Sequence, residues 1–291
     1  MSTFRRLWRN LTFRFGMIFL VMLTCVALAA PFLGTVDPAV LDYSLINRPA
    51  GERVDFALPG GVTVPHTLWM GSDAYGRDIY SRVIYGARIS LLVAFFVASV
   101  AVIVGVILGV LAGFFRGLDS LIMRTMDALM AFPSILLAIA LVAALGATLW
   151  TVIVAVAVPE IPRVVRLVRS MVLSLREEPF VEAAIALATP TSTILRKHVM
   201  PNAMAPLIVQ GTFIAASAVL TEAALSFLGL GLPADIPTWG NIMAEGRVQF
   251  SQYPGNVLFP ALFLVPTILA INLLGDGMRD VLDPKFSKRT A

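Results

Sequence analysis

Residues 89–115 read ISLLVAFFVASVAVIVGVILGVLAGFF, a continuous apolar run that contains no charged side chain. A helix needs about 20 mostly apolar residues to cross the hydrocarbon core of a bilayer, so this run is long enough to cross it. The rest of the chain has the same character, with 58% hydrophobic residues, 14% charged residues and a mean hydropathy of +0.86. An ordinary soluble domain carries roughly 25% charged residues. The composition therefore predicts an all-α polytopic membrane protein.

Six apolar runs are candidates for membrane-spanning helices. The second is longer than the hydrocarbon core requires, so we expect it to tilt or to project from the bilayer. The third and fourth overlap because no polar turn separates them, and residues 146–150 are the expected hairpin. The fourth is short and is interrupted by Pro159, Glu160 and Pro162. In chain order, the predicted spans are residues 15–33, 89–115, 129–149, 147–162, 203–228 and 257–275.

The distribution of lysine and arginine predicts the orientation, because loops on the cytoplasmic side are enriched in both residues. Sixteen of the 22 lie on the inner side if the N-terminus is cytoplasmic. We therefore expect a multi-pass protein of the cell (inner) membrane, embedded in the lipid bilayer, with both termini in the cytoplasm. The basic start and the small residues 27–29 also fit a cleaved secretory signal. Because the apolar run continues to Leu33, a retained first span is the favoured interpretation.

The segment PFVEAAIALATPTSTILRKHVMPN, residues 179–202, lies between two apolar runs on the expected cytoplasmic side. Pro179, Pro190 and Pro201 punctuate it, and proline is tolerated in the first turn of a helix but breaks a helix interior. The spacing predicts one short helix over residues 180–188 and a second over residues 190–200, with Thr189 as the N-cap of the second.

The first of these short helices has the features of a docking surface. Glu182 is its only charge, beside the small side chains of Ala183, Ala184 and Ala188. Small residues allow a partner to approach closely, and one carboxylate can pair with a basic residue there. The residues alone leave a second interpretation open, in which this helix is amphipathic and lies on the bilayer surface.

Four stretches of the chain form an ordered set that extends over most of it from Met70 onward. This set resembles the second permease subunit of binding-protein-dependent ABC importers of the dipeptide, oligopeptide or nickel type. The stretches are MGSDAYGRDIYSRVIYGARISLLVA (70–94), EAA (182–184) with ILRKHVMPN (194–202), TEAALSFLGLG (221–231) with PTWG (237–240), and NLLGDGMRDVLDP (272–284).

The resemblance implies a type I ABC importer permease fold with six transmembrane helices. It implies that residues 179–202 are a coupling loop, which sits in a cleft of a cytoplasmic ATPase and moves the attached spans. The expected partners are a second homologous permease subunit, two ATP-binding cassette subunits that use ATP, and an extracytoplasmic solute-binding protein. The expected solute is a peptide or a similar small molecule. The implied docking residues are Glu182, Ala183, Ala184, Leu187, Ala188 and Pro201.

The loop departs from the family pattern at two positions. Members usually have glycine where this chain has Ala188, and often arginine where it has Ile185. Glycine adopts a left-handed turn freely, whereas alanine pays about 1–2 kcal/mol for a positive φ. We therefore expect Thr189 and Pro190 to make this turn by another route.

Several kinds of chemistry have no sequence signal here. No G-x-x-x-x-G-K-[ST] phosphate-binding loop occurs, so we expect any ATPase to be a separate polypeptide. His66 and His198 are the only histidines and Cys25 is the only cysteine. We therefore predict no catalytic residues, no metal site and no cofactor bound by this chain. Its net charge of +4 does not indicate nucleic-acid binding, because the basic residues are not interleaved with solvent-facing aromatics.

Two further groups of residues are candidates for roles within the membrane. Gly105, Gly109 and Gly113 follow a G-x-x-x-G spacing, which allows close helix packing, either within the subunit or against a second permease. Glu222 lies in an apolar run, where a carboxylate by default faces protein or a water-filled pathway. We therefore consider Glu222, with Phe227, as pathway or gate residues, against a structural alternative in which Glu222 is a polar anchor.

Other charged and aromatic positions have simpler interpretations. Arg163, Arg166 and Arg169 share one helical face and are interpreted as headgroup anchors. The turns at residues 229–231 and 239–240 could contact the external solute-binding protein that the resemblance implies.

The chain divides into three parts. Residues 1–85 comprise the N-terminal cytoplasmic tail, the first span and a long outer loop whose beginning, residues 35–70, need not have fixed structure. From Arg77 the loop turns helical, and Ile79, Val83, Ala87 and Leu91 predict an amphipathic helix that lies in the outer interface and leads into the second span. Residues 86–280 are the predicted permease domain, with the coupling loop at 179–202, and residues 281–291 form a cytoplasmic tail.

Two alternative functions remain from the residues alone. A secondary transporter would need ion-coupling carboxylates within the membrane or inverted repeats, and only Glu222 fits that description. A non-transporting scaffold or sensor would leave the docking loop and the buried carboxylate without a role.

Overall fold

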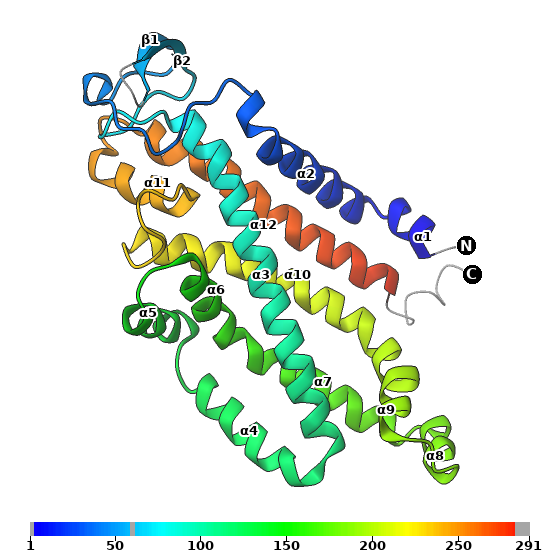
Figure 1. The fold of residues 1–291 in the computed structure, drawn as a ribbon. Helices are drawn as coiled ribbons and strands as arrows, with labels where there is room; N and C mark the ends of the chain where they lie inside the picture. The colour runs from blue at the N-terminus through cyan, green and yellow to red at the C-terminus, as the bar shows by residue number, and fades with distance from the viewer. Residues whose placement is uncertain (1–2, 59–61, 283–291) are drawn as a thin grey trace.

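The computed structural model describes residues 3–58 and 62–282, and it is a bundle of helices with a small β-hairpin at one end (Figure 1). We call the two ends of the bundle the hairpin end and the α8 end. The hairpin is antiparallel and consists of β1 (Glu52–Ala57) and β2 (Thr63–Leu68). The helices are α1 (Thr3–Arg9), α2 (Leu11–Leu28), α3 (Ile79–Phe114), α4 (Arg116–Met130), α5 (Ser134–Leu145), α6 (Leu149–Ala157), α7 (Ile161–Arg176), α8 (Pro179–Ala186), α9 (Thr191–Ile194), α10 (Met200–Phe227), α11 (Trp239–Gly246) and α12 (Gly255–Leu282).

Four of the described helices, α2, α3, α10 and α12, are long and apolar enough to cross a membrane. A fifth crossing results if α4 and α5 are counted as one span, although they meet at an angle of 91°. The prediction of six spans is therefore not confirmed, and the difference lies in the third and fourth predicted runs. These correspond to α5, which has 12 residues, and to α6, which has nine.

Proline explains why the third and fourth runs are divided. Pro133 follows the break between α4 and α5, and a proline disfavours helical geometry in the residue before it. After α6, a 3₁₀ turn at Val158–Glu160 contains Pro159 and leads directly into α7. The helical path over residues 149–176 is therefore continuous but changes its geometry at this turn. The second half, α7, carries polar residues on one face instead of continuing the apolar run.

The described part of the long loop before α3, residues 35–58 and 62–70, has a defined structure, which differs from the prediction that this segment need not have one. The hairpin occupies much of this segment, and a 3₁₀ turn at Tyr43–Leu45 precedes it. Asp42 accepts hydrogen bonds from the Ser44 amide at 3.0 Å and from the Ala57 amide at 3.2 Å. Burial alone raises the pKa of the Asp42 carboxyl, but these hydrogen bonds hold that pKa below its ordinary value.

The predicted helix forms and leads into the second span, but its apolar stripe packs against protein and does not lie in the outer interface. Ile79, Val83 and Ala87 are fully buried, and they lie in the first turns of α3, which runs 36 residues without a break. Asp78 caps α3 by accepting a hydrogen bond from the Ser81 amide at 2.9 Å. The proposed domain boundary at residues 85–86 therefore falls inside this helix.

Helices α3 and α7 pack along a seam of glycines against valines. Gly105, Gly109 and Gly113 contact Val164, Val168 and Val172, one pair on each successive turn. A Cβ added at Gly109 would lie 2.6 Å from the Val168 Cβ, which is too close for two carbons. The glycine stripe thus packs within this chain, and the two helices approach as closely as their backbones allow.

We expect Gly109→Ala to destabilise the protein by about 1–3 kcal/mol, because the added methyl group overpacks the seam. Thermal unfolding of the purified protein in detergent measures the effect. Gly117→Ala is the matched control, because a Cβ at that position has no neighbour within 4 Å. Equal melting temperatures for the two variants would contradict the close packing of α3 against α7 at Gly109.

Candidate functional site

Helix α8 projects from the end of the molecule opposite the hairpin (Figure 1). Glu182, Ala183, Leu187 and Ala188 of the predicted docking set are exposed, with Leu187 80% accessible. Ala184 is buried against the rest of the chain. One face of this helix therefore anchors the loop, and the opposite face presents Glu182 among small and apolar side chains.

The turn after α8 contains an alanine in the left-handed conformation. Ala188 has φ +52°, its amide bonds the Ile185 carbonyl, and the Thr189 amide bonds the Ala184 carbonyl at 3.0 Å. These two hydrogen bonds form a Schellman motif, the usual way for a helix to end with a residue of positive φ. The expectation that Thr189 and Pro190 replace the left-handed residue is wrong, because Ala188 itself adopts that conformation.

We expect Ala188→Gly to stabilise the loop by about 0.5–1 kcal/mol, because glycine avoids the left-handed strain but loses more entropy on folding. Hydrogen exchange of the amides over residues 184–189 reports the local opening free energy. Ala186→Gly is the matched control, since that residue is helical, and there glycine should accelerate exchange. Faster exchange in Ala188→Gly than in the unmodified protein would contradict the proposed backbone strain at Ala188.

The second predicted loop helix does not end at Met200. Helix α9 continues through a π-helical segment, Leu195–Val199, directly into α10. Pro201 is exposed and lies at the start of α10, directly after the π-helical segment. On its other side, α8 follows α7 after only Glu177 and Glu178. The loop is therefore connected on both sides to long helices that reach into the bundle.

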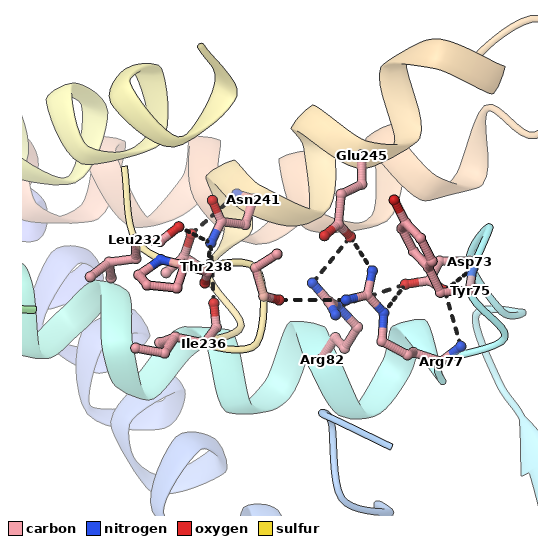
Figure 2. Close-up of polar contacts among 11 residues, drawn as sticks. Asp73, Tyr75, Arg77, Arg82, Leu232, Ile236, Thr238, Asn241 and Glu245 are labelled. Atoms are coloured by element: carbon pink, nitrogen blue, oxygen red, sulfur yellow. Dashed lines mark hydrogen bonds and ion pairs between the residues drawn. The ribbon is translucent and has the colours of Figure 1, made fainter. Parts of the chain in front are cut away.

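A cluster of charged residues lies buried near the hairpin end (Figure 2). Arg77 donates from Nε to Asp73 at 2.7 Å, and its terminal nitrogens reach Glu245 and the Ala234 carbonyl. Arg82 is fully buried and donates to Glu245 at 3.2 Å. The cluster joins the segment before α3, α3 itself and α11, and its two acids balance its two bases.

The sequence pattern did not predict this cluster, because Glu245 is 163 residues further along the chain than Arg82. The sequence feature that could have indicated the cluster is Arg82, an arginine in the first turns of a helix that leads into an apolar run. Such a residue needs an acidic partner when it is buried.

The intramembrane candidate Glu222 is buried among groups of its own chain. Its carboxylate accepts a hydrogen bond from the Ser226 hydroxyl at 2.8 Å, and the Thr238 side chain is a second hydrogen-bond partner. Phe227 is half-buried beneath the guanidinium of Arg247, which lies 5.0 Å from the ring centroid. Glu222 and Phe227 therefore have different partners, and the contacts of Glu222 favour the polar-anchor role.

The second predicted contact turn is buried. Trp239 is fully buried and donates from its ring nitrogen to the Val83 carbonyl at 3.1 Å, and Gly240 packs against Ala223. Residues 239–240 therefore hold α11 against α3 and α10 and are not available to an external protein. Leu230 and Val248 are exposed at this end of the bundle.

The three arginines of α7 form ion pairs within the chain. Arg166 bonds Asp127 at 2.6 Å, and Arg169 holds both carboxylate oxygens of Asp119, so these two residues tie α7 to α4. Arg163 bonds Glu160 at 3.1 Å. The headgroup-anchor interpretation thus gives way to intramolecular pairing. Among the described residues, no group of three or more His, Cys, Asp or Glu side chains is placed to hold a metal ion.

These features define a class before any comparison: a polytopic helical membrane protein with a protruding loop at one end and an ordered cap at the other. Residues 101–288 match the family model described as binding-protein-dependent transport system inner membrane component. The chain belongs to this family.

Three relatives with known names illustrate the family. The chain is 45% identical over 265 residues to a probable peptide ABC transporter permease protein of Sinorhizobium fredii, covering 91% of this chain and 86% of the relative. It is 42% identical to the dipeptide transport system permease protein DppC of Alkalihalophilus pseudofirmus, covering 98% and 90%. It is 41% identical to the glutathione transport system permease protein GsiD of Escherichia coli, covering 92% and 85%.

A solved structure supports the fold. A chain of the inward-facing MetNI methionine ABC transporter superimposes with a TM-score of 0.56 at 21% identity, covering 70% of this chain and 98% of that chain. The helical core therefore has the fold of a permease from an ABC transporter. The two comparisons together support the class that the sequence resemblance implied.

Proposed function

We propose that this chain is one of two permease subunits of an ATP-driven importer for peptides or a similar small solute. With a second, homologous permease it forms the translocation pathway. The names of relatives that cover nearly all of this chain support the peptide class, because they are peptide, dipeptide and glutathione permeases. An extracytoplasmic solute-binding protein delivers the solute at the hairpin end.

The observation that carries the coupling part of this proposal is the exposed face of α8. Glu182, Ala183 and Leu187 project at one end of the molecule, on a short helix fixed between α7 and α10. Closure of an ATPase dimer around such a helix moves both long helices together. The ATP is bound by those partner subunits, and this chain binds no cofactor and catalyses no reaction of its own.

We further propose six crossings, with both termini in the cytoplasm. The bent pair α4–α5 is the third crossing, and the continuous path over residues 149–176 is the fourth. The excess of lysine and arginine on the α8 side supports this orientation. Asn10 and Asp280 are also hydrogen-bonded to each other, so the two terminal helices lie side by side on the same side of the bundle.

Co-purification tests this function. The tagged chain is expressed with the genes that neighbour its own and extracted from membranes. ATP-binding cassette subunits should accompany it, and solute uptake by the intact cells should require ATP. A chain that inserts correctly but brings no ATPase subunit would contradict the importer. Uptake that persists without ATP would favour a secondary transporter, and the absence of any uptake would favour a scaffold.

A further inference from the structure

A pocket of about 530 Å³ lies between α7, α10 and α12, and it contrasts with the apolar surface elsewhere on the bundle. The polar residues that line it are Asn202 and Gln210 of α10 and Arg279 of α12. Leu167 forms the α7 wall. This pocket is on the part of the bundle nearer to α8, because Asn202 is in the first turn of α10, directly after the loop.

A second set of polar residues, Glu160, Arg163 and Ser217, lies further from α8 along the α7 and α10 walls of this pocket. Arg163 lies one turn before Leu167 on α7, and residues four apart share a helical face. The Glu160 carboxylate bonds Arg163 at 3.1 Å through one oxygen and accepts a hydrogen bond from the Ser217 hydroxyl at 3.3 Å through the other. Ser217 likewise lies one turn beyond Phe213, which lines the pocket.

The depth of this group is given by α10. Ser217 stands 14 residues after Ala203, the start of the apolar run, which corresponds to about 20 Å at the helical rise per residue. The Glu160–Arg163 pair is therefore inside the part of the bundle that α10 carries across the membrane. Glu160 is buried, with 7% of its side chain accessible, but the side chain of Arg163 is 56% accessible.

An accessible guanidinium at that depth is incompatible with a lipid-facing surface. Charged side chains within a membrane face water-filled cavities or protein, because contact with hydrocarbon is costly. Among the described residues, Glu160 is the hydrogen-bond partner of Arg163, and it contacts a single terminal nitrogen of the guanidinium. The exposed edge of Arg163 and the accessible side chain of Arg279 leave donors for a planar anion, and a guanidinium binds a carboxylate in two parallel hydrogen bonds.

From this arrangement we infer that the cleft between α7, α10 and α12 is part of the solute pathway. Arg279, in the pocket, and Arg163, one helical turn from Leu167, bind the C-terminal carboxylate of a peptide one after the other as it passes. This inference rests on the proposed importer function and adds the chemical group that is recognised. A phospholipid headgroup is an anion as well, so the test must distinguish a peptide carboxylate from a lipid phosphate.

The test uses thiol accessibility in the intact complex. Cys25 is replaced by serine, and Leu167→Cys places a thiol in the wall of the pocket, beside Arg163. An anionic and a cationic thiosulfonate of similar size are compared. We expect the anionic reagent to label Cys at position 167 at least five times faster than the cationic one. Arg163→Met should lower that preference, Arg163→Met combined with Arg279→Met should abolish it, and Arg163→Lys should keep it.

Two controls locate the effect. Phe95→Cys, at an accessible position on the apolar surface of α3, should not be labelled, because its thiol does not ionise in lipid. Arg166→Met removes a charge from the same helix but away from the pocket, where Arg166 pairs with Asp127, and it should leave the preference unchanged. Absence of labelling at position 167, or equal rates for the two reagents, would overturn the aqueous anion site.

Peptides added to the labelling reaction show which kind of anion binds in the pocket. Dialanine at millimolar concentration should slow the labelling at least threefold more than dialanine amide, which lacks the carboxylate. Equal protection by the two, or protection only by added phosphatidylglycerol, would overturn the carboxylate assignment. Retention of ATPase subunits is scored separately in every variant. A complex that keeps its ATPases but shows no preference refutes this inference alone, whereas loss of ATPases from the unmodified chain refutes the importer.

Discussion

Glu182→Lys is expected to abolish ATPase binding while leaving the membrane-embedded part of the protein folded. Glu182 is exposed on α8, and no described ion pair involves it, so its replacement removes no contact that holds the fold. In the proposed complex this carboxylate pairs with a basic residue in a desolvated groove. Reversing the charge places two like charges there, which costs several kcal/mol. We therefore expect co-purified ATPase to fall at least tenfold.

The measurement is the amount of ATPase subunit that accompanies a tagged chain from membranes. Glu177→Lys is the matched control, because Glu177 is an exposed acid on the same connection but outside α8. It should retain most of the ATPase. The melting temperatures of both variants should equal that of the unmodified protein. Retention of ATPase in Glu182→Lys at the level of the control would exclude the α8 face as the docking surface.

Glu245→Ala is expected to have the largest effect on stability. It removes the acid that pairs with both Arg77 and Arg82, and Arg82 is fully buried. Removing one partner of a buried ion pair costs about 3–5 kcal/mol, because the remaining charge stays desolvated. The loss should also release α11 from the segment before α3, since the cluster is where these two parts meet.

The thermal unfolding of the purified protein in detergent measures this effect. Glu52→Ala provides the comparison, since Glu52 pairs with Arg48 at 3.3 Å on the surface, with 31% and 47% of the two side chains accessible. Exposed pairs of this kind contribute about 0–1 kcal/mol, so the melting temperature should barely change. Similar melting temperatures for the two variants would show that the buried cluster does not hold the hairpin end together.

Several features of this protein follow from the sequence because they depend on local composition. Apolar runs long enough to cross a bilayer predict the membrane class whatever their partners are. The proline spacing over residues 179–202 predicted the break between the two loop helices, and the structure confirms α8 within a residue or two of the predicted bounds. The glycine spacing in α3 likewise predicted a surface for close packing, although it could not identify the helix that packs there.

Other local predictions failed where tertiary contacts override propensity. The segment over residues 35–70 is rich in turn-forming residues, yet a hairpin forms because Phe56 and Leu68 are fully buried in it. Ala188 adopts a positive φ because two hydrogen bonds of the helix end require that geometry. In both cases, contacts made by neighbouring residues outweigh the preference of a single residue.

By itself, the sequence determined that this chain is a helical membrane protein, where its apolar runs lie and where the exposed loop that carries α8 begins. Only the tertiary structure decided that α3 packs against α7, that Arg82 pairs with Glu245, and that Arg169 pairs with Asp119. The physical reason is that hydrophobicity and turn propensity are properties of short segments. The partner of a charge or of a glycine stripe is instead chosen by the packing of helices that are far apart in the chain.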